Sequence, residues 1–220
     1  MKHITFFSCF FLLLVAGLAI ANSLQQPANL AELRYGNQAK QRILALESLL
    51  IHLQPASESG KLEGINAFFN DNIDFVSDQD NWGVSDYWAT PLESLGKQEG
   101  DCEDYTIAKY IFLRLLGIPD ERLKMTYVKA QIGGPHSKVY QAHMVLIYYE
   151  TPSAEPLILD NLVSSILSSS RRTDLRPVFS FNSTGLWIGK STKSSSLKSL
   201  SRWSDVLTRI RNDGIQYFNN

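Results

Sequence analysis

Apolar residues recur at helical spacing in three stretches of the chain. Leucine and isoleucine return every three or four positions from Asn37 to Leu53, and Pro55 stops the pattern. The segment from Lys61 to Phe69 repeats it more briefly. The stretch from Cys102 to Leu116 is the most apolar of the three and has few polar positions, so we expect a largely buried helix there.

This third stretch also carries its own start and stop signals. Asp101 precedes it and is a good N-cap residue, because its side chain can accept from exposed backbone N–H groups. Gly117 suits the position after the last turn, and Pro119 prevents continuation. Cys102 is therefore predicted to lie in the first turn of the helix.

A strand pattern replaces the helical one further along the chain. The segments LKMTYVKAQI (123–132), YQAHMVLIYYE (140–150) and LILDNLV (157–163) are rich in β-branched and aromatic residues, with short turns between them. A later segment, PVFSFNSTGLWIG, has room for one more strand. Short connections favour antiparallel pairing, so N-terminal helices followed by an antiparallel sheet predict an α+β fold.

The remaining segments are expected to connect these elements. We expect a loop over 70–100, within which Pro91 could open a short helix, and a second loop over 164–174. The serine- and lysine-rich segment 191–201 is typical of a linker, and 202–213 is predicted to form a closing helix.

The first residues have the pattern of a secretory signal peptide. Lys2 is followed by an apolar run from Phe6 to Ile20, and Ala19-Ile20-Ala21 provides small residues for cleavage. A single membrane anchor is the alternative, but the run is short for one. We therefore expect a signal peptide over 1–21, no membrane insertion after its removal, and one exported domain over 22–220.

Charge and cysteine content narrow the function further. The formal net charge is −1, which does not favour nucleic acid or an anionic membrane surface as a partner. Of the two cysteines, Cys9 lies in the predicted signal peptide and Cys102 remains. A single cysteine in an exported domain indicates a reactive group or intermolecular pairing, and a buried inert thiol is the alternative.

Two further residues could activate this thiol. His143 lies inside an apolar strand, whereas His52 and His136 suit surface positions. Asp160 ends the next strand, where adjacent antiparallel strands would bring the two side chains within reach. Cys102, His143 and Asp160 thus form a candidate triad of nucleophile, base and orienting carboxylate. A core histidine and a turn aspartate remain the simpler interpretation.

The acids around the cysteine need an explanation of their own. Asp101, Glu103 and Asp104 surround Cys102, and neighbouring carboxylates disfavour a thiolate. Either they form a solvated acidic first turn, which the helix dipole favours, or they bind something positively charged.

The chain contains the segments WATPLESLGKQEGDCEDYTIAKYIFLRLLGIP, QAHMVLIYY and LILDNL, in this order. They resemble the bacterial transglutaminase-like cysteine proteases of the periplasmic LapG type, and the resemblance extends from about Leu46 to Ile210. It implies a papain-like, transglutaminase-like fold with Cys102 as nucleophile, His143 as base and Asp160 as orienting residue.

The same resemblance implies cofactor, substrate and regulation. Calcium would be bound by Asp101 and Glu103, with Asp104 as a candidate and Asp80 or Asn81 as possible further ligands. The substrate would be the N-terminal region of a large surface adhesin, whose release disperses biofilm. The protein would act in the periplasm, where an inner-membrane cyclic-di-GMP receptor would control it through its periplasmic domain.

Other functions remain open at this stage. The same triad supports transglutaminase or amidase chemistry, with an amine in place of water. A calcium-responsive periplasmic binding module with a decayed site is an alternative from another class, and a small exported structural protein is a third. Trp82 and Trp88 could line a substrate groove or pack beneath it, while Trp187 and Trp203 are expected to pack the C-terminal segment onto the core.

Overall fold

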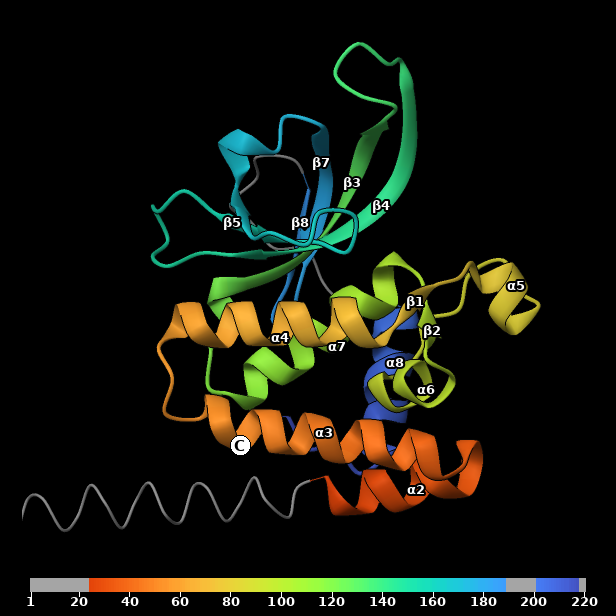
Figure 1. Ribbon diagram of the computed structural model, residues 1–220. Helices are drawn as coiled ribbons and strands as arrows, with labels where there is room; N and C mark the ends of the chain where they lie inside the picture. Colours follow the sequence, from red (N-terminus) through yellow and green to blue (C-terminus); the bar gives the residue numbers. More distant parts are fainter. Residues whose placement is uncertain (1–23, 189–200, 218–220) are drawn as a thin grey trace, which may run out of the picture.

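The structure of the protein is a computed structural model that describes residues 24–188 and 201–217 (Figure 1). The predicted signal peptide, Cys9 and nearly all of the predicted linker over 191–201 lie outside these residues. Within the described ranges, no helix combines the length and apolar character needed to cross a membrane.

Helices form the N-terminal half of the fold. Their bounds are α2 Gln25–Tyr35, α3 Asn37–Leu53, α4 Glu58–Asn72, α5 Asp78–Trp82, α6 Pro91–Lys97, α7 Cys102–Leu115 and the C-terminal α8 Ser201–Asn212. The bounds predicted for α3 are confirmed, and α4 begins earlier and ends later than its apolar pattern indicated. Helix α2 was not predicted, because it packs into the core through small residues such as Ala28 and Ala31 instead of a stripe of large ones.

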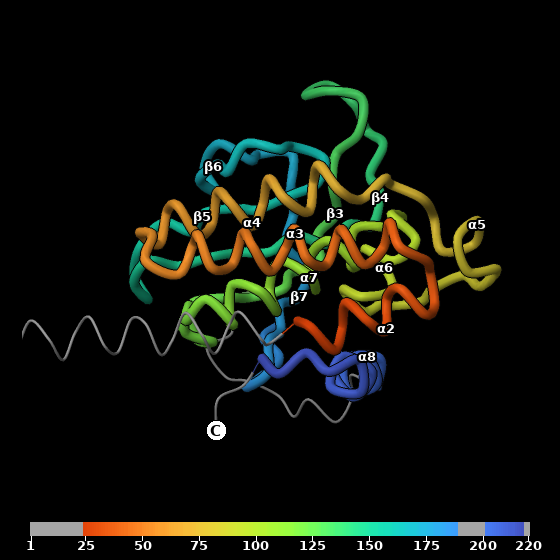
Figure 2. Tube along the Cα trace, turned by 60° about the horizontal axis from the view of Figure 1, so that its bottom comes forward, coloured from red at the N-terminus to blue at the C-terminus, as the bar shows by residue number. Residues whose placement is uncertain are grey.

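Helix α7 lies at the centre of the molecule, among the other helices and beneath the sheet (Figures 1 and 2). Nearly all of its side chains are buried, as the apolar sequence predicted. At its C-terminal end Gly117 has φ +89° and donates to Arg114 O, while Ile118 donates to Leu113 O. This pair of bonds is the glycine-terminated helix end expected from Gly117.

The second half of the fold is a six-stranded antiparallel sheet with the order β6-β5-β4-β3-β7-β8. Its strands are β3 Leu123–Ile132, β4 Val139–Tyr148, β5 Leu157–Leu159, β6 Leu167–Ser168, β7 Leu175–Phe181 and β8 Leu186–Ile188. The bounds of β3 match the prediction, and the α+β class is confirmed. Four consecutive strands form a meander, and β7 then pairs with the other edge of β3.

Three sequence predictions about this half were inaccurate. The segment PVFSFNSTGLWIG, expected to hold one strand, contains most of β7 and all of β8. The strand expected over 157–163 ends at Leu159, because the next residue turns its side chain to accept from the backbone N–H of Leu162. The loop expected over 164–174 contains strand β6 and a 3-10 turn at Ser169–Arg171.

The segment 70–100 is more ordered than the loop we predicted. Strands β1 (Asp74–Phe75) and β2 (Glu99–Gly100) pair in parallel, and α5 stands at the margin of the molecule in both views (Figures 1 and 2). The predicted short helix after Pro91 is present as α6, and Thr90 and Glu93 cap it reciprocally. This segment leads directly to the first turn of α7.

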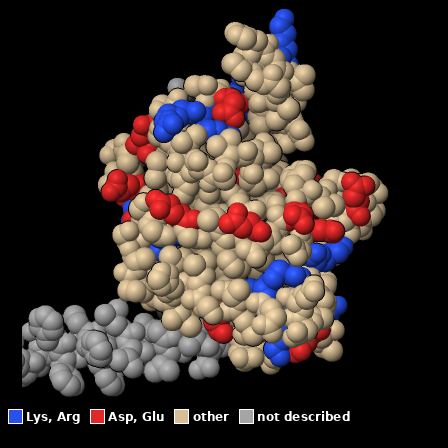
Figure 3. Space-filling view, in the orientation of Figure 1, with Lys and Arg blue, Asp and Glu red and all other residues tan. Residues whose placement is uncertain are grey.

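The two faces of the sheet have different surroundings. Met144 and Leu146 of β4 belong to the main core shared with α7, whereas Val145 and Ile147 belong to a smaller cluster on the other face. Charged side chains are dispersed on the face shown in Figure 3, where Lys and Arg form small groups among Asp and Glu. That distribution agrees with the net charge of −1.

Candidate active site and acidic cluster

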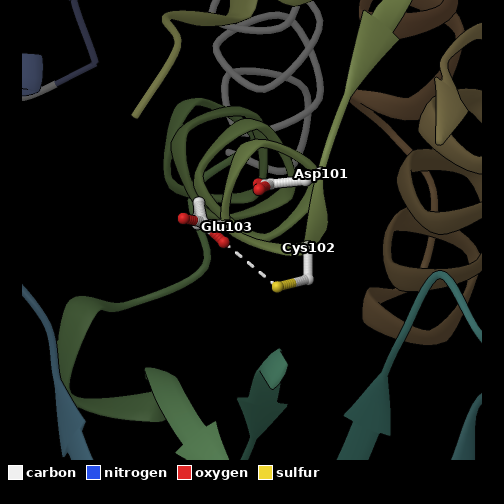
Figure 4. A group of neighbouring side chains, drawn as sticks. All are labelled: Asp101, Cys102 and Glu103. Carbon is white, nitrogen blue, oxygen red and sulfur yellow. Dashed lines mark hydrogen bonds between the residues drawn. The ribbon is translucent and has the colours of Figure 1, made fainter. Parts of the chain in front are cut away.

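Cys102 is the first residue of α7, directly after the N-cap residue Asp101. Its thiol donates a hydrogen bond to Oε2 of Glu103 at 3.0 Å, and Figure 4 shows these two side chains pointing toward one another. The hydroxyl of Thr106 donates to the carbonyls of Cys102 (2.8 Å) and Met144 (3.2 Å). These bonds tie the first turn of α7 to strand β4.

The surroundings of Cys102 keep its thiol protonated. Burial raises the pKa of the Cys102 thiol, and the nearby carboxylates of Glu103 and Asp101 raise it further. A backbone hydrogen bond from Met144 opposes this shift. The Thr106 hydroxyl, shared by the carbonyls of Cys102 and Met144, places the first turn of α7 beside β4. The Cys102 thiol therefore needs a base and a compensating positive charge to ionise near neutral pH.

His143 and Asp160 form a buried pair. Nε2 of His143 lies 2.7 Å from Oδ1 of Asp160, and the two residues are 4% and 2% exposed. Burial would raise the pKa of the Asp160 carboxyl, but hydrogen bonds from His143, Leu162 and Arg172 outweigh it and lower that pKa to about 2. The structure thus brings together the base and orienting residue that the sequence proposed, while His136 is exposed.

Three residues around Asp160 were not predicted to belong to the site. Nη2 of Arg172 lies 2.7 Å from Oδ2 of Asp160. Asn70 and Lys109 both donate to the backbone carbonyl of Asp160, at 2.9 and 3.2 Å. Burial lowers the pKa of Lys109 to about 7, although the Asp160 charge opposes this shift. Lysine in an otherwise apolar helix was a visible signal, whereas nothing local marks Asn70 or Arg172.

Five carboxylates gather at the start of α7. Ligand atoms of Asp78, Asp101 and Asp104 lie within 4.8 Å of one another, and so do those of Asp78, Asp86 and Glu103. The structure brings Asp101, Glu103 and Asp104 together, as predicted, and adds Asp78 and Asp86 from the preceding segment. Asp80, considered as a further ligand, instead accepts from Ser77 at the start of α5.

These five carboxylates are only partly balanced by positive charge: among the described residues, Arg202 pairs with Asp86 at 2.9 Å. Burial raises the pKa of Asp101 to about 10, with a further contribution from Glu103, and burial also raises the pKa of Asp104 and Asp78. Oδ1 atoms of Asp78, Asp86 and Asp101 are buried without a hydrogen-bond partner. Several oxygen ligands with unpaired lone pairs fit a hard divalent cation.

The two tryptophans before Cys102 have different surroundings. Trp88 is 4% exposed and stacks on Phe181 at 5.7 Å, so it packs into the core. Trp82 is partly exposed, with the Lys97 ammonium 4.1 Å from its ring centre. Trp203 is buried in the core, as predicted.

A cysteine begins the central helix, and a histidine in β4 pairs with an aspartate directly after β5. With helices followed by an antiparallel sheet, this is the arrangement expected of a cysteine protease of the transglutaminase-like class. The family model described as bacterial transglutaminase-like cysteine proteinase matches residues 24–184. The chain belongs to this family, which confirms the resemblance and the fold predicted from the sequence.

Solved structures of Legionella pneumophila LapG are similar to this chain. One is 38% identical, covers 86% of this chain and 97% of its own, and superposes with a TM-score of 0.72. The EGTA-treated and calcium-bound forms of that protein, also 38% identical, have TM-scores of 0.74 and 0.73. No curated protein matches the chain.

Proposed function

We propose that the protein is a calcium-dependent endopeptidase in which Cys102 is the nucleophile, His143 the base and Asp160 the orienting residue. The observation that carries this proposal is the buried 2.7 Å bond between His143 and Asp160. The next residue of the strand, Met144, is tied to Cys102 through the Thr106 hydroxyl, which donates to both backbone carbonyls. A nucleophile, a base and a group that orients the base are the parts that covalent acyl transfer requires.

The reaction proceeds in two steps. His143 takes the proton of the Cys102 thiol, and the thiolate attacks the peptide carbonyl carbon, so that a carbon–sulfur bond forms. The C–N bond then breaks as His143 donates its proton to the leaving amine. In the second step His143 accepts a proton from water, whose oxygen attacks the thioester and releases the carboxylate product and the thiol. Backbone N–H groups at the start of α7 would stabilise the oxyanion.

The residues at the start of α7 suit a calcium ion, and relatives of 38% identity carry titles that name calcium-bound and EGTA-treated forms. Asp101, Glu103 and Asp104 would hold it, together with Asp78 and Asp86, whose unpartnered oxygens face the same cluster. When bound, calcium supplies positive charge that offsets the clustered carboxylates. Glu103, engaged as a ligand, would no longer accept from the thiol, and His143 would be left to take its proton.

The family relationship also supports a proposal for the substrate of the protein and for its regulation. We propose that the protein is exported by its signal peptide to the periplasm and cleaves the N-terminal region of a large surface adhesin, which promotes biofilm dispersal. We also propose that an inner-membrane cyclic-di-GMP receptor controls it through the receptor's periplasmic domain. The membership of the chain in the family supports these assignments.

The identity of the products tests the chemistry. A purified N-terminal adhesin fragment is incubated with the mature protein and with Cys102→Ala, and the products are identified by mass spectrometry. Two peptides whose masses sum to the fragment plus one water, absent with Cys102→Ala, are expected. Isopeptide-linked products would indicate transfer to an amine instead, and an intact fragment bound by both proteins would indicate a binding module.

A further inference from the structure

Arg172 is a charged residue in the interior that the reaction described above does not use. It follows the 3-10 turn after β6 and is 4% exposed. Its Nη2 lies 2.7 Å from Oδ2 of Asp160. Its Nε and Nη2 also donate to the two carboxylate oxygens of Asp174, at 3.0 and 2.9 Å. One guanidinium thus joins the orienting carboxylate of the site to a second carboxylate nearer the surface.

The two oxygens of Asp160 have separate partners. Oδ1 faces His143 at 2.7 Å and accepts from the backbone N–H of Leu162 at 3.1 Å. Oδ2 lies against Arg172, the one cationic side chain at this oxygen among the described residues. Because both oxygens are engaged from different directions, rotation of the carboxylate would break an interaction on each side.

The other polar neighbours hold a different part of the residue. Asn70 and Lys109 donate to the backbone carbonyl of Asp160, and the ammonium of Lys109 also donates to Oδ1 of Asn70 at 2.7 Å. These contacts hold the main chain where β5 ends. The orientation of the carboxylate group therefore depends on Arg172 at Oδ2 and on His143 and Leu162 at Oδ1.

We propose that Arg172 is a positioning residue of the active site: its direct contact holds the Asp160 carboxylate in the orientation that directs Oδ1 to His143. The inference rests on the proposed triad. Placing a charge here is costly, because a buried ion pair loses the hydration of both partners. A planar guanidinium offsets this cost by hydrogen bonding to Asp174 while its charge pairs with Asp160.

The alternative is that Arg172 merely fastens the turn after β6 to the start of β7. In that case the bonds to Asp174 matter most, and the contact with Asp160 is incidental. The two explanations differ in their consequences for Asp174→Asn, which weakens the anchor but leaves the pair between Arg172 and Asp160 in place.

A cavity beside Arg172 makes a chemical test possible. Arg172 lines a cavity of about 460 Å³ on the sheet face away from α7, together with Val128, Val145 and Ser169. In Arg172→Ala a small cation could therefore reach the vacated position. Guanidinium at sub-denaturing concentration reproduces the lost group, and urea has the same shape without the charge.

The experiment measures two rates in calcium for the wild type, Arg172→Ala and Asp174→Asn. One is cleavage of the adhesin fragment, and the other is alkylation of Cys102 by iodoacetamide, followed by mass spectrometry. Alkylation needs no substrate, so it tests Arg172 even if the adhesin is not cleaved. Circular dichroism and the Tm of each variant show whether it is folded.

We expect Arg172→Ala to lower kcat about tenfold to a hundredfold with little change in KM, because a misplaced base slows chemistry more than binding. Alkylation should slow in parallel, guanidinium should restore part of both rates, and urea should restore neither. Asp174→Asn should stay within a few fold of the wild type. Unchanged rates in folded Arg172→Ala, equal rescue by urea, or an equal loss in Asp174→Asn would overturn the proposal.

A second pair of variants covers the case in which Arg172→Ala does not fold. Arg172→Lys keeps a positive charge that can reach Asp160, while Arg172→Met keeps the length of the side chain without the charge. The proposal expects Arg172→Lys to retain clearly more alkylation and cleavage than Arg172→Met. Equal rates in these two variants would overturn it.

Discussion

The imidazole Nε2 of His143 lies 2.7 Å from Oδ1 of Asp160, and both side chains are almost completely shielded from water. The bond assigns one ring nitrogen to the carboxylate, so in the proposed mechanism Nδ1 exchanges a proton with the Cys102 thiol. The backbone carbonyls of Cys102 and of Met144, the next residue of the strand, both accept from the Thr106 hydroxyl. The predictions below test what this arrangement implies.

Replacing His143, the proposed base, should leave a Cys102 thiol that reacts slowly. His143→Ala should reduce cleavage by about 10²–10⁴-fold, the usual contribution of a general acid–base, and should slow alkylation of Cys102 at pH 7. His136→Ala, a change at an exposed turn, is the matched control and should behave like the wild type. Rapid alkylation in His143→Ala would mean that the helix start alone activates the thiol.

The pair between His143 and Asp160 should contribute stability that depends on pH. The pKa of Asp160 is about 2 in the folded protein, below its ordinary 3.8, so ionised Asp160 favours the folded state above pH 4. This contribution is lost as the pH falls toward 2. The difference in the free energy of unfolding between the wild type and Asp160→Asn should therefore narrow by about 2 kcal/mol over that range.

Urea unfolding at pH 7, 4, 3 and 2 measures this change. Asp71→Asn, at an exposed position, is the control and should differ little from the wild type at any of these values. A difference for Asp160→Asn that stays constant with pH would contradict the assignment of a favourably paired carboxylate.

The acidic cluster should destabilise the protein when calcium is removed. Burial and neighbouring carboxylates raise the pKa of Asp101 to about 10. The folded protein therefore keeps a proton on Asp101 that the unfolded chain releases, and this lowers the free energy of unfolding increasingly as the pH rises above 4. Asp101→Asn in EGTA at pH 8 should raise Tm by about 2–4 °C if it relieves about 1 kcal/mol.

In calcium, the wild type should have a higher Tm than Asp101→Asn. The wild type should gain Tm in calcium, because an ion bound only by the folded state stabilises it, and Asp101→Asn should gain much less. Thermal unfolding of both proteins in calcium and in EGTA gives the four Tm values. Equal calcium-induced shifts in the two proteins would place the ligands elsewhere.

Export should remove the predicted signal peptide. Cleavage after Ala21 leaves Asn22 as the first residue, so intact mass and N-terminal sequencing of protein from a periplasmic fraction should identify that terminus. Recovery of the full-length chain with the membranes would instead support the anchor alternative.

The elements with strong periodic patterns were predictable from the sequence. Helix α3 and strand β3 have the predicted bounds because large apolar residues mark every turn or every second position. Helix α2 lacks that pattern, since small residues bury its inner face. Strand β6 is two residues long and exists only by pairing with β5, so no local signal could reveal it.

The residues of the site also divide into those that a local sequence pattern marks and those that only the tertiary structure brings together. The sequence alone suggested Cys102, His143 and Asp160. Each is a reactive residue type that lies inside an apolar helix or strand or at its end. Asp78 and Asp86 join the acidic cluster only when the segment before α6 folds back against α7. Arg172 reaches Asp160 through the tertiary structure, and no spacing along the chain indicates that contact.

The calcium dependence of cleavage tests the central claim most directly. The initial rate of cleavage of the adhesin N-terminal fragment is measured for the mature protein in calcium and in EGTA, with Cys102→Ala measured beside it. We predict cleavage in calcium that is lost in EGTA, restored by excess calcium, and absent in Cys102→Ala under all conditions. Cleavage that persists in EGTA or in Cys102→Ala would contradict a calcium-dependent protease with Cys102 as its nucleophile.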